Sequence, residues 1–332
     1  MNSVSPLPFP SGRPEPYRPL TDEPVFDAAV HLALEKPERS TNLQSLGYQP
    51  HELEHCESDF AHSSAFRILS QEGVAAMHHV CEQIYDNRNA SAGTGANRLG
   101  SYARGAGYRS TFIRDFCDSP ELAKHLSEIA GVTLGRHSVP AVACGINYAP
   151  DDITKAIDTW HVDSVAFDVV MMLSDPTTLK GGEFQVFDGT KHEGQALLGI
   201  DGEEGRDAQL PDERVITIPF PEAGFGFLQQ GTMIFHRACR LLEKASRITM
   251  IPSFEVLPAH ADDSTNSLNM ADWEDPSICP ELARHEVWRA SARLDALLQE
   301  IQLADDPKQL GDRISIAVAR LNAFSNKLQS RS

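Results

Sequence analysis

The chain lacks the features that mark secreted, membrane-spanning or disulfide-stabilised proteins. Its six cysteines include no CxxC pair and no dense framework, which predicts reduced thiols: Cys56, Cys81, Cys117, Cys144, Cys239 and Cys279. No apolar run approaches the ~20 residues that a membrane helix needs. The N-terminal string MNSVSPLPFPSGRPEPYRP is too rich in proline and too poor in apolar residues for a signal peptide. We therefore expect a cytoplasmic protein.

Basic residues are also few. The chain has 29 Lys and Arg against 47 Asp and Glu, and its formal net charge is -18. Such a charge repels phosphate backbones and anionic membrane surfaces, and no run of Lys or Arg offsets it locally. Neither nucleic acid nor a membrane is an expected partner. A net negative charge also keeps a protein soluble, so it does not by itself indicate a cationic substrate.

The remaining composition is that of a soluble globular protein. Hydrophobic residues make up 41% of the 332 residues and charged residues 23%, which allows a substantial core. Residues 1–22 carry repeated prolines and predict an extended arm. Residues 23–138 predict a helical region, 139–257 a strand-rich core and 258–332 a second helical region. We expect residues 22–332 to form one integrated domain.

Three helices are predicted in the N-terminal region from apolar residues at helical spacing: Glu23–Lys36, Ser70–Tyr85 and Ser119–Ala130. For the third, Ser119 suits the N-cap, Pro120 the first helical position and Gly131 the end. A Gly-rich stretch with Arg98, Arg104 and Arg109 separates the second helix from the third. It predicts a long functional loop or lid.

Short apolar runs bounded by turn residues then predict strands: Val139–Ala149, Phe167–Leu173, Glu183–Phe187, Val215–Ile218, Gly226–Leu228, Thr232–Phe235 and Ile248–Val256. Many short strands with Gly and Pro turns favour a sandwich or jelly roll. The acidic, Gly-rich stretch Asp188–Glu213 predicts a mobile insertion. Two C-terminal helices follow, one with an apolar face through Leu294 and Leu298 and the other through Ala317 and Phe324. They are expected to pack on the strand core.

The string Trp160-His161-Val162-Asp163 lies between two predicted strands. In an extended chain, residues i and i+2 point to the same side, so an imidazole and a carboxylate can reach one ion. A metal that must also bind oxygen needs a third ligand and open positions, as in the two-His-one-carboxylate facial triad. The third ligand is expected from a later strand.

His236 is expected to close the predicted strand Thr232–Phe235, and Arg247 follows eleven residues later. Thr249 lies two positions beyond Arg247 and so shares its face. A guanidinium is a natural partner for a carboxylate, because its planar fork forms two charge-assisted hydrogen bonds. Together these residues form the pattern HxD, a long gap, H, ten residues and RxT.

This pattern resembles the Fe(II)/2-oxoglutarate-dependent dioxygenase superfamily over roughly Val139 to Val256. Supporting strings are INYAP, which contains Asn147 and Tyr148, and GGEFQVF after the HxD motif. WHVDS, LQQG and RITM followed by SF resemble a group of small-molecule oxygenases. The resemblance implies a β fold with helical additions: a double-stranded β-helix (jelly roll) core flanked by N- and C-terminal helices.

The resemblance also implies a chemistry. Fe(II) would be held by His161, Asp163 and His236, while Arg247, Thr249, Asn147 and Tyr148 would form the site for 2-oxoglutarate. With O2, the co-substrate would yield succinate and CO2 as a C–H bond of a small molecule is hydroxylated, desaturated or cyclised. The substrate class would be an amino acid or a secondary-metabolite intermediate. Asp163 argues against halogenation, since halogenases of the superfamily carry a small residue at that position.

Several alternatives stay open. Arg104 and Arg109 are either surface charges or ligands of an anionic substrate group, with Arg109 ranked first. Trp160 is either a packing residue or a wall of the substrate pocket, and Asn147 and Tyr148 could serve only the strand and its packing. A protein hydroxylase, a non-oxidative cupin-like metal protein and a partner-binding scaffold are competing functions. A cupin has no need for a buried Arg247. The substrate and the oligomeric state are open.

Overall fold

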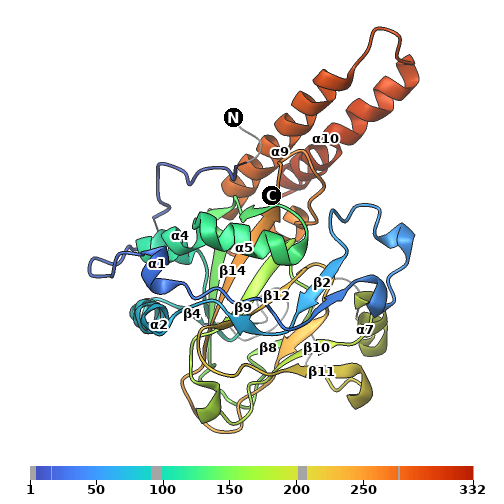
Figure 1. Ribbon diagram of the computed structural model, residues 1–332. Helices are drawn as coiled ribbons and strands as arrows, with labels where there is room; N and C mark the ends of the chain where they lie inside the picture. Colours follow the sequence, from blue (N-terminus) through green and yellow to red (C-terminus); the bar gives the residue numbers. More distant parts are fainter. Residues whose placement is uncertain (1–4, 16, 91–98, 201–207, 276, 332) are drawn as a thin grey trace.

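The computed structural model describes residues 5–15, 17–90, 99–200, 208–275 and 277–331. It contains two antiparallel sheets with helices on the outside (Figure 1). The strands are β1 Ser40–Asn42, β2 Phe60–Ser63, β3 Phe66–Arg67, β4 Asn89–Ala90, β5 Ser101–Ala103, β6 Leu134–Arg136, β7 Cys144–Tyr148, β8 Asp158–His161, β9 Phe167–Met172, β10 Phe184–Phe187, β11 Val215–Ile218, β12 Phe225–Gln229, β13 His236–Ala238 and β14 Ile248–Val256.

The α-helices are α1 Ala28–His31, α2 Gln71–Tyr85, α3 Ala106–Arg109, α4 Thr111–Cys117, α5 Pro120–Ala130, α6 Pro140–Ala143, α7 Lys191–Leu198, α8 Ser267–Met270, α9 Ile278–Glu300 and α10 Pro307–Gln329. Short 3-10 helices occupy Gln44–Leu46, Pro50–Glu52, Pro176–Thr178 and Asp212–Arg214. None of the helices in the described part of the chain is long and apolar enough to cross a membrane. All six cysteines are free thiols.

The two sheets differ in size and enclose a shared apolar layer. The larger runs in the order β1-β2-β12-β9-β14-β7-β5-β4, with β3 paired to β12 and β6 to β14, and the smaller runs β11-β10-β13-β8. Phe227 of the larger sheet meets Phe184 of the smaller one with ring centroids 5.2 Å apart. Val170 and Val186 are buried in the same cluster. Burial of this layer holds the sheets face to face.

Helices α1, α2, α4 and α5 cover the outer face of the larger sheet (Figure 1). The expected helix caps of α5 are confirmed: Ser119 accepts a hydrogen bond from the N–H of Leu122, Pro120 is the first helical residue, and Gly131 has the left-handed φ of 69° that ends the helix. Leu126 of α5 is fully buried against the sheet.

Four predicted elements need correction. Only Ala28–His31 of the expected helix Glu23–Lys36 is helical. The expected strand Val139–Ala149 begins with the helical turn α6, because Pro140 suits a first helical position. Residues 232–235, expected as a strand, form the end of a turn and an irregular segment. Strand β13 begins at His236, the residue that was expected to end the strand. The described parts of the insertion, 188–200 and 208–213, include α7 and bury Leu198 and Leu210, so they are packed.

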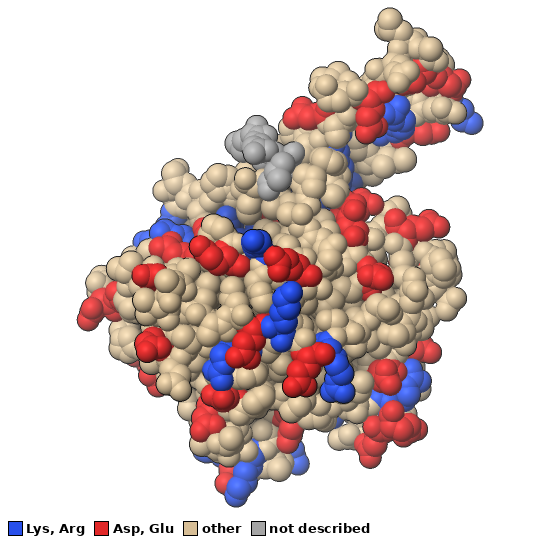
Figure 2. Space-filling view, viewed as in Figure 1, with Lys and Arg blue, Asp and Glu red and all other residues tan. Residues whose placement is uncertain are grey.

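The C-terminal helices α9 and α10 are present, but they pack differently from the expectation. They form a hairpin whose far half extends away from the sheets (Figure 1). The predicted apolar face of α9 is largely solvent-accessible there, with Leu294 40% and Leu298 66% exposed. On the face drawn in Figure 2, Lys and Arg lie singly among Asp and Glu along the hairpin and the body.

A matched pair of substitutions tests this packing. Leu126→Ala should lower the free energy of unfolding by about 2–5 kcal/mol, because it leaves a cavity in the core. Leu298→Ala should change it by less than about 0.5 kcal/mol, since that side chain is mostly exposed. Urea denaturation followed by circular dichroism measures both. Similar losses in the two variants would contradict the exposed position of Leu298.

Candidate active site

Two histidines face each other across a pair of short strands. His236, the first residue of β13, lies directly opposite His161, the last residue of β8, and their ring centroids are 4.1 Å apart. Asp163 lies two residues beyond His161, with Oδ1 3.3 Å from His161 Nε2 and Oδ2 3.2 Å from His236 Nε2. One ligand atom of each residue falls within 4.8 Å of the others. The three predicted ligands thus meet at one point.

The outer nitrogens of both rings are anchored to the backbone. His161 Nδ1 lies 2.6 Å from the carbonyl of Thr159, and His236 Nδ1 lies 2.9 Å from the carbonyl of Ile234. A carbonyl only accepts, so each Nδ1 carries a proton, and Nε2, on the side of Asp163, is the ring nitrogen that can bind a metal ion. Metal-ligating imidazoles are commonly held in this way. The ring orientation therefore suits a metal ion.

Asp163 is the carboxylate that reaches both imidazoles. Burial alone would raise the pKa of Asp163, but the charges of His236 and His161 and the hydrogen bonds to them outweigh burial and hold that pKa well below its usual range. Asp158 is another carboxyl of the cavity and is buried, with Oδ2 3.6 Å from His161 Nε2. Two imidazoles and one ionised carboxylate are the donor set of a facial triad.

Arg247 lies in the same cavity as the triad, just before β14 in the larger sheet. It is 1% exposed; its Nε donates to the carbonyl of Gly182 at 3.0 Å, and Nη1 to Thr249 Oγ1 at 3.4 Å. Nη2 is buried and has no hydrogen-bond partner among the residues that the structure describes. Burial lowers the pKa of Arg247 to about 10, so the guanidinium is still charged at neutral pH.

The cavity that joins these groups has a volume of about 120 Å³ and lies between the two sheets. Asn147 and Thr249 both line it, and they are partners in the β7–β14 pairing. Tyr148 does not line it. Its hydroxyl donates to the carbonyl of Cys81 at 2.7 Å on the opposite side of β7. Adjacent strand residues face opposite ways, so only one of Asn147 and Tyr148 could enter the cavity.

Trp160 also lies outside the cavity. It stacks on Phe235 with ring centroids 5.4 Å apart, and its Nε1 donates to the carbonyl of Ala208. The same alternation that turns His161 inward turns Trp160 outward. The packing interpretation of this residue thus accounts for its position.

The two arginines named as substrate ligands are separated by the fold. Arg104 lines the cavity and stacks on Trp273, with its guanidinium carbon 3.7 Å from the ring centre. Arg109 is 7% exposed and lies outside the cavity, with its guanidinium carbon 5.2 Å from the ring centre of Tyr17 in the N-terminal arm. Of the two residues ranked from the sequence with Arg109 first, only Arg104 therefore lies at the cavity. Arg98 lies outside the described residues.

Sequence reasoning missed three residues at this site. Gln229 is fully buried, and its Nε2 lies within hydrogen-bonding distance of both Asp163 and Asp168. Burial and the neighbouring charge of Asp163 raise the pKa of Asp168 well above its usual range. Asp158 carried a local signal, because it lies three residues before His161 in the same strand. Gln229 lies in the LQQG string, which gave a resemblance but no role for this residue, and Asp168 carried no signal, since a polar residue in a strand is usually exposed.

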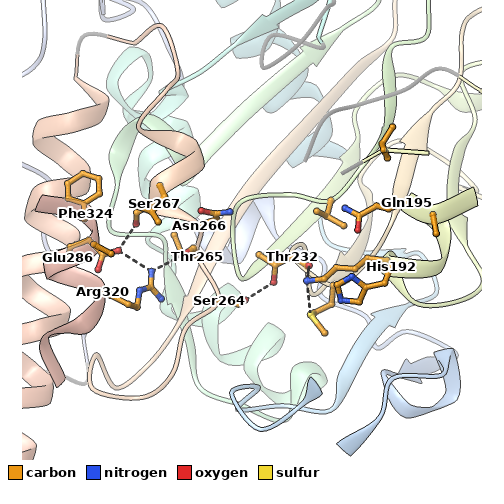
Figure 3. Close-up of a pocket in the computed structure, with 17 residues that line it drawn as sticks. His192, Gln195, Thr232, Ser264, Thr265, Asn266, Ser267, Glu286, Arg320 and Phe324 are labelled. Carbon is orange, nitrogen blue, oxygen red and sulfur yellow. Dashed lines mark hydrogen bonds and ion pairs between the residues drawn. The ribbon is translucent and has the colours of Figure 1, made fainter. Parts of the chain in front are cut away.

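A larger pocket of 680 Å³ lies between α7 and the C-terminal helices (Figure 3). Its charged side chains are already paired: Arg320 with Glu286 at 3.0 Å, and Lys191 with the carbonyl of Thr232 at 3.0 Å. Val162 reaches it, but none of the triad lines it. The chemistry therefore belongs to the smaller cavity.

No protein-family model and no curated protein sequence matches the chain. Structural neighbours are non-haem iron and 2-oxoglutarate enzymes. The carbocyclase SnoK from nogalamycin biosynthesis is 14% identical, with a TM-score of 0.42 over 64% of this chain and 86% of that one. The epimerase SnoN in complex with Fe3+, alpha ketoglutarate and nogalamycin RO is 12% identical, with a TM-score of 0.39 over 69% and 94%.

EvdO2 from Micromonospora carbonacea var. aurantiaca, complexed with 2-oxoglutarate, is 14% identical, with a TM-score of 0.39 over 63% of this chain and 91% of that one. Similarity at this level shows no reaction for this chain. The reaction has to be inferred from the donor set of the triad and from the buried guanidinium.

Loss of one ligand should abolish tight metal binding. We expect wild-type protein to bind one Fe(II) per chain, and His236→Ala or Asp163→Ala to bind none after desalting, because two remaining donors hold iron weakly. Metal analysis by mass spectrometry measures the stoichiometry. His31→Ala, which alters a buried histidine of α1, is the control and should retain full stoichiometry. Iron retained in His236→Ala would show that this residue is not a ligand.

Proposed function

We propose that this protein is an Fe(II)- and 2-oxoglutarate-dependent oxygenase that oxidises a C–H bond of a small molecule. The observation that carries the proposal is the unpartnered, buried Nη2 of Arg247 in the cavity that holds the His161, Asp163 and His236 cluster. A buried guanidinium nitrogen without an acceptor is costly unless a ligand supplies one. A dicarboxylate held between the metal centre and Arg247 supplies it.

The residues present fit both groups. His161, Asp163 and His236 would hold Fe(II), which when bound supplies the activation of O2 that protein side chains do not provide. Arg247 and Thr249 would bind the distal carboxylate of 2-oxoglutarate, and Asn147 faces the same space. The apolar walls Val170 and Phe184 exclude water from the reacting end. In this scheme succinate and CO2 leave as the substrate is oxidised.

The proposal extends to the fold and its parts. The two facing sheets are taken as the halves of a double-stranded β-helix, with residues 139–257 as the catalytic core and residues 23–138 and 258–332 as helical additions. The antiparallel strands, and the position of every proposed ligand between the sheets, support this assignment.

The alternatives explain less of the site. A cupin-like metal protein would not explain why the charged side chain of Arg247 is buried beside the metal site. A protein hydroxylase needs a groove for an extended chain, whereas the cavity at the triad holds about 120 Å³ and is walled by Tyr102, Arg104 and Trp273.

The type of C–H oxidation depends on the substrate, which screening a metabolite library can identify. Incubation with Fe(II) and 2-oxoglutarate, addition of O2 and mass detection of succinate and product is the assay.

Removal of the guanidinium tests the co-substrate assignment. Truncating Arg247 leaves a desolvated carboxylate unpaired, a loss of about 2–5 kcal/mol. Arg247→Ala should therefore weaken 2-oxoglutarate binding by roughly thirty-fold or more, at about 1.4 kcal/mol per ten-fold change. Arg247→Lys should be intermediate, since it keeps the charge and loses the planar fork. Anaerobic titration of the visible charge-transfer band measures the affinity.

The comparison requires that each variant is folded and binds iron, which thermal melting and metal analysis establish first. A change of less than about three-fold in Arg247→Ala would mean that another residue holds the distal carboxylate.

The different positions of the two loop arginines give a second test. We propose that Arg104, which lines the cavity, contacts an anionic group of the substrate. With the substrate found by library screening, Arg104→Gln should raise its apparent KM about ten-fold or more, as expected for a lost charge-assisted bond. Turnover of 2-oxoglutarate without substrate should be unchanged. Arg109→Gln is the matched control, and an equal rise in KM in both variants would eliminate the assignment.

A further inference from the structure

The motif Leu228-Gln229-Gln230-Gly231 is not accounted for by the ligands or by Arg247. It begins at the end of β12 and turns toward the loop that carries Asp163. We infer that Gln229, supported by Gly231, is a positioning residue that fixes the carboxylate of Asp163 for metal binding. The inference uses the metal-binding part of the proposed function and is independent of 2-oxoglutarate.

The side chain of Gln229 joins two carboxyl groups. Its Nε2 donates to Asp163 Oδ2 at 3.2 Å and to Asp168 Oδ1 at 3.0 Å, and the same nitrogen lies 3.4 Å from His236 Nε2. Gln229, Asp168 and His236 are buried, and the side chain of Asp163 is 19% exposed, so the amide lies on the enclosed side of the ligand. The two hydrogens of one amide group thus serve the two carboxyl groups.

The neighbouring carboxyls also determine the orientation of the amide. The opposite orientation would point Oε1 at the ionised carboxylate of Asp163, and an acceptor facing an acceptor is unfavourable at a site that is largely enclosed. Gln229 is held in β12, which pairs with β9 such that Gln229 lies opposite Asp168. The position of the donor is therefore set by the larger sheet.

Gly231 holds the main chain of Asp163 in place. Its carbonyl accepts a hydrogen bond from the N–H of Asp163 at 2.9 Å, and its own N–H donates to the carbonyl of Ala166 at 3.0 Å. A Cβ at Gly231 would collide with Asp168 Oδ2 and would lie 2.8 Å from the carbonyl of Val165. The motif thus holds both the main chain and the carboxylate of Asp163.

The position of Asp163 follows from these contacts. Residues 162–166 leave β8 and form no regular element, so strand pairing does not hold the ligand in place. Without Nε2 of Gln229, each of the two carboxyls of Asp163 and Asp168 would lose a hydrogen-bond donor. Outer-shell partners of this kind typically change metal affinity by about 10–100-fold.

The neighbour Gln230 provides a matched control. It is 3% exposed, and its Nε2 donates to the carbonyls of Ser58 and Phe60 at 3.2 and 2.7 Å, so it is also buried and doubly bonded. Its side chain makes no hydrogen bond to the proposed ligands. Gln230→Leu should lower stability about as much as Gln229→Leu without altering the metal centre.

The experiment is an anaerobic titration of purified full-length protein with Co(II), followed by its visible absorption spectrum. Gln229→Leu should raise the Kd for Co(II) about ten-fold or more and change the position or intensity of the band. Gln229→Asn, which keeps the amide at a shorter reach, should give a smaller rise. Gln230→Leu should leave Kd and spectrum within about three-fold of wild type. Thermal melting of the metal-free variants controls for folding.

An unchanged Kd and spectrum in Gln229→Leu, or equal effects in Gln229→Leu and Gln230→Leu, would overturn the inference. If Gln229→Leu does not fold, Gln229→Asn decides by the same criteria. Failure of the proposed function is a different result: wild type that binds Co(II) but not 2-oxoglutarate loses that function, while the comparison of the glutamine variants still stands.

Discussion

The register of β8 against β13 is the constraint on which the site depends. Because the side-chain period of a strand is two, the pairing of His236 with His161 places both imidazoles on one face, and a slip of one residue would turn one ring away. Neither strand is long, since β8 has four residues and β13 three. The pairings of β13 with β10 and of β10 with β11 extend the same sheet and hold the register.

The larger sheet adds groups that the smaller sheet cannot supply. Strand β14 carries Thr249 and follows Arg247, while β12 and β9 carry Gln229 and Asp168. The apolar layer between the sheets excludes water from all of these side chains, so each buried polar atom needs a partner. Among the described residues, Nη2 of Arg247, Oδ2 of Asp168 and Oε1 of Gln229 have none. Of these three residues only Arg247 lines the cavity, so the site combines a set of metal ligands with a cationic donor that has no acceptor.

Much of this could be predicted from local pattern. The HxD spacing, the later His236 and the distance to Arg247 placed the main residues, and the cap residues placed α5. The alternation of strand side chains could also have excluded Trp160 and Tyr148, as neighbours of His161 and Asn147. Other features depend on tertiary contacts. Residues 232–235 form a turn despite their apolar character, Arg109 is covered by the N-terminal arm, and Leu298 lies on a projecting hairpin.

The proposed function depends on where a metal ion and a dicarboxylate bind. The most direct measurement is a crystal structure of the protein prepared anaerobically with Fe(II) and 2-oxoglutarate. The account predicts iron bound by Nε2 of His161, Nε2 of His236 and the carboxylate of Asp163, with the distal carboxylate of 2-oxoglutarate on Arg247. Iron at another place, or a 2-oxoglutarate carboxylate that does not contact Arg247, would contradict it.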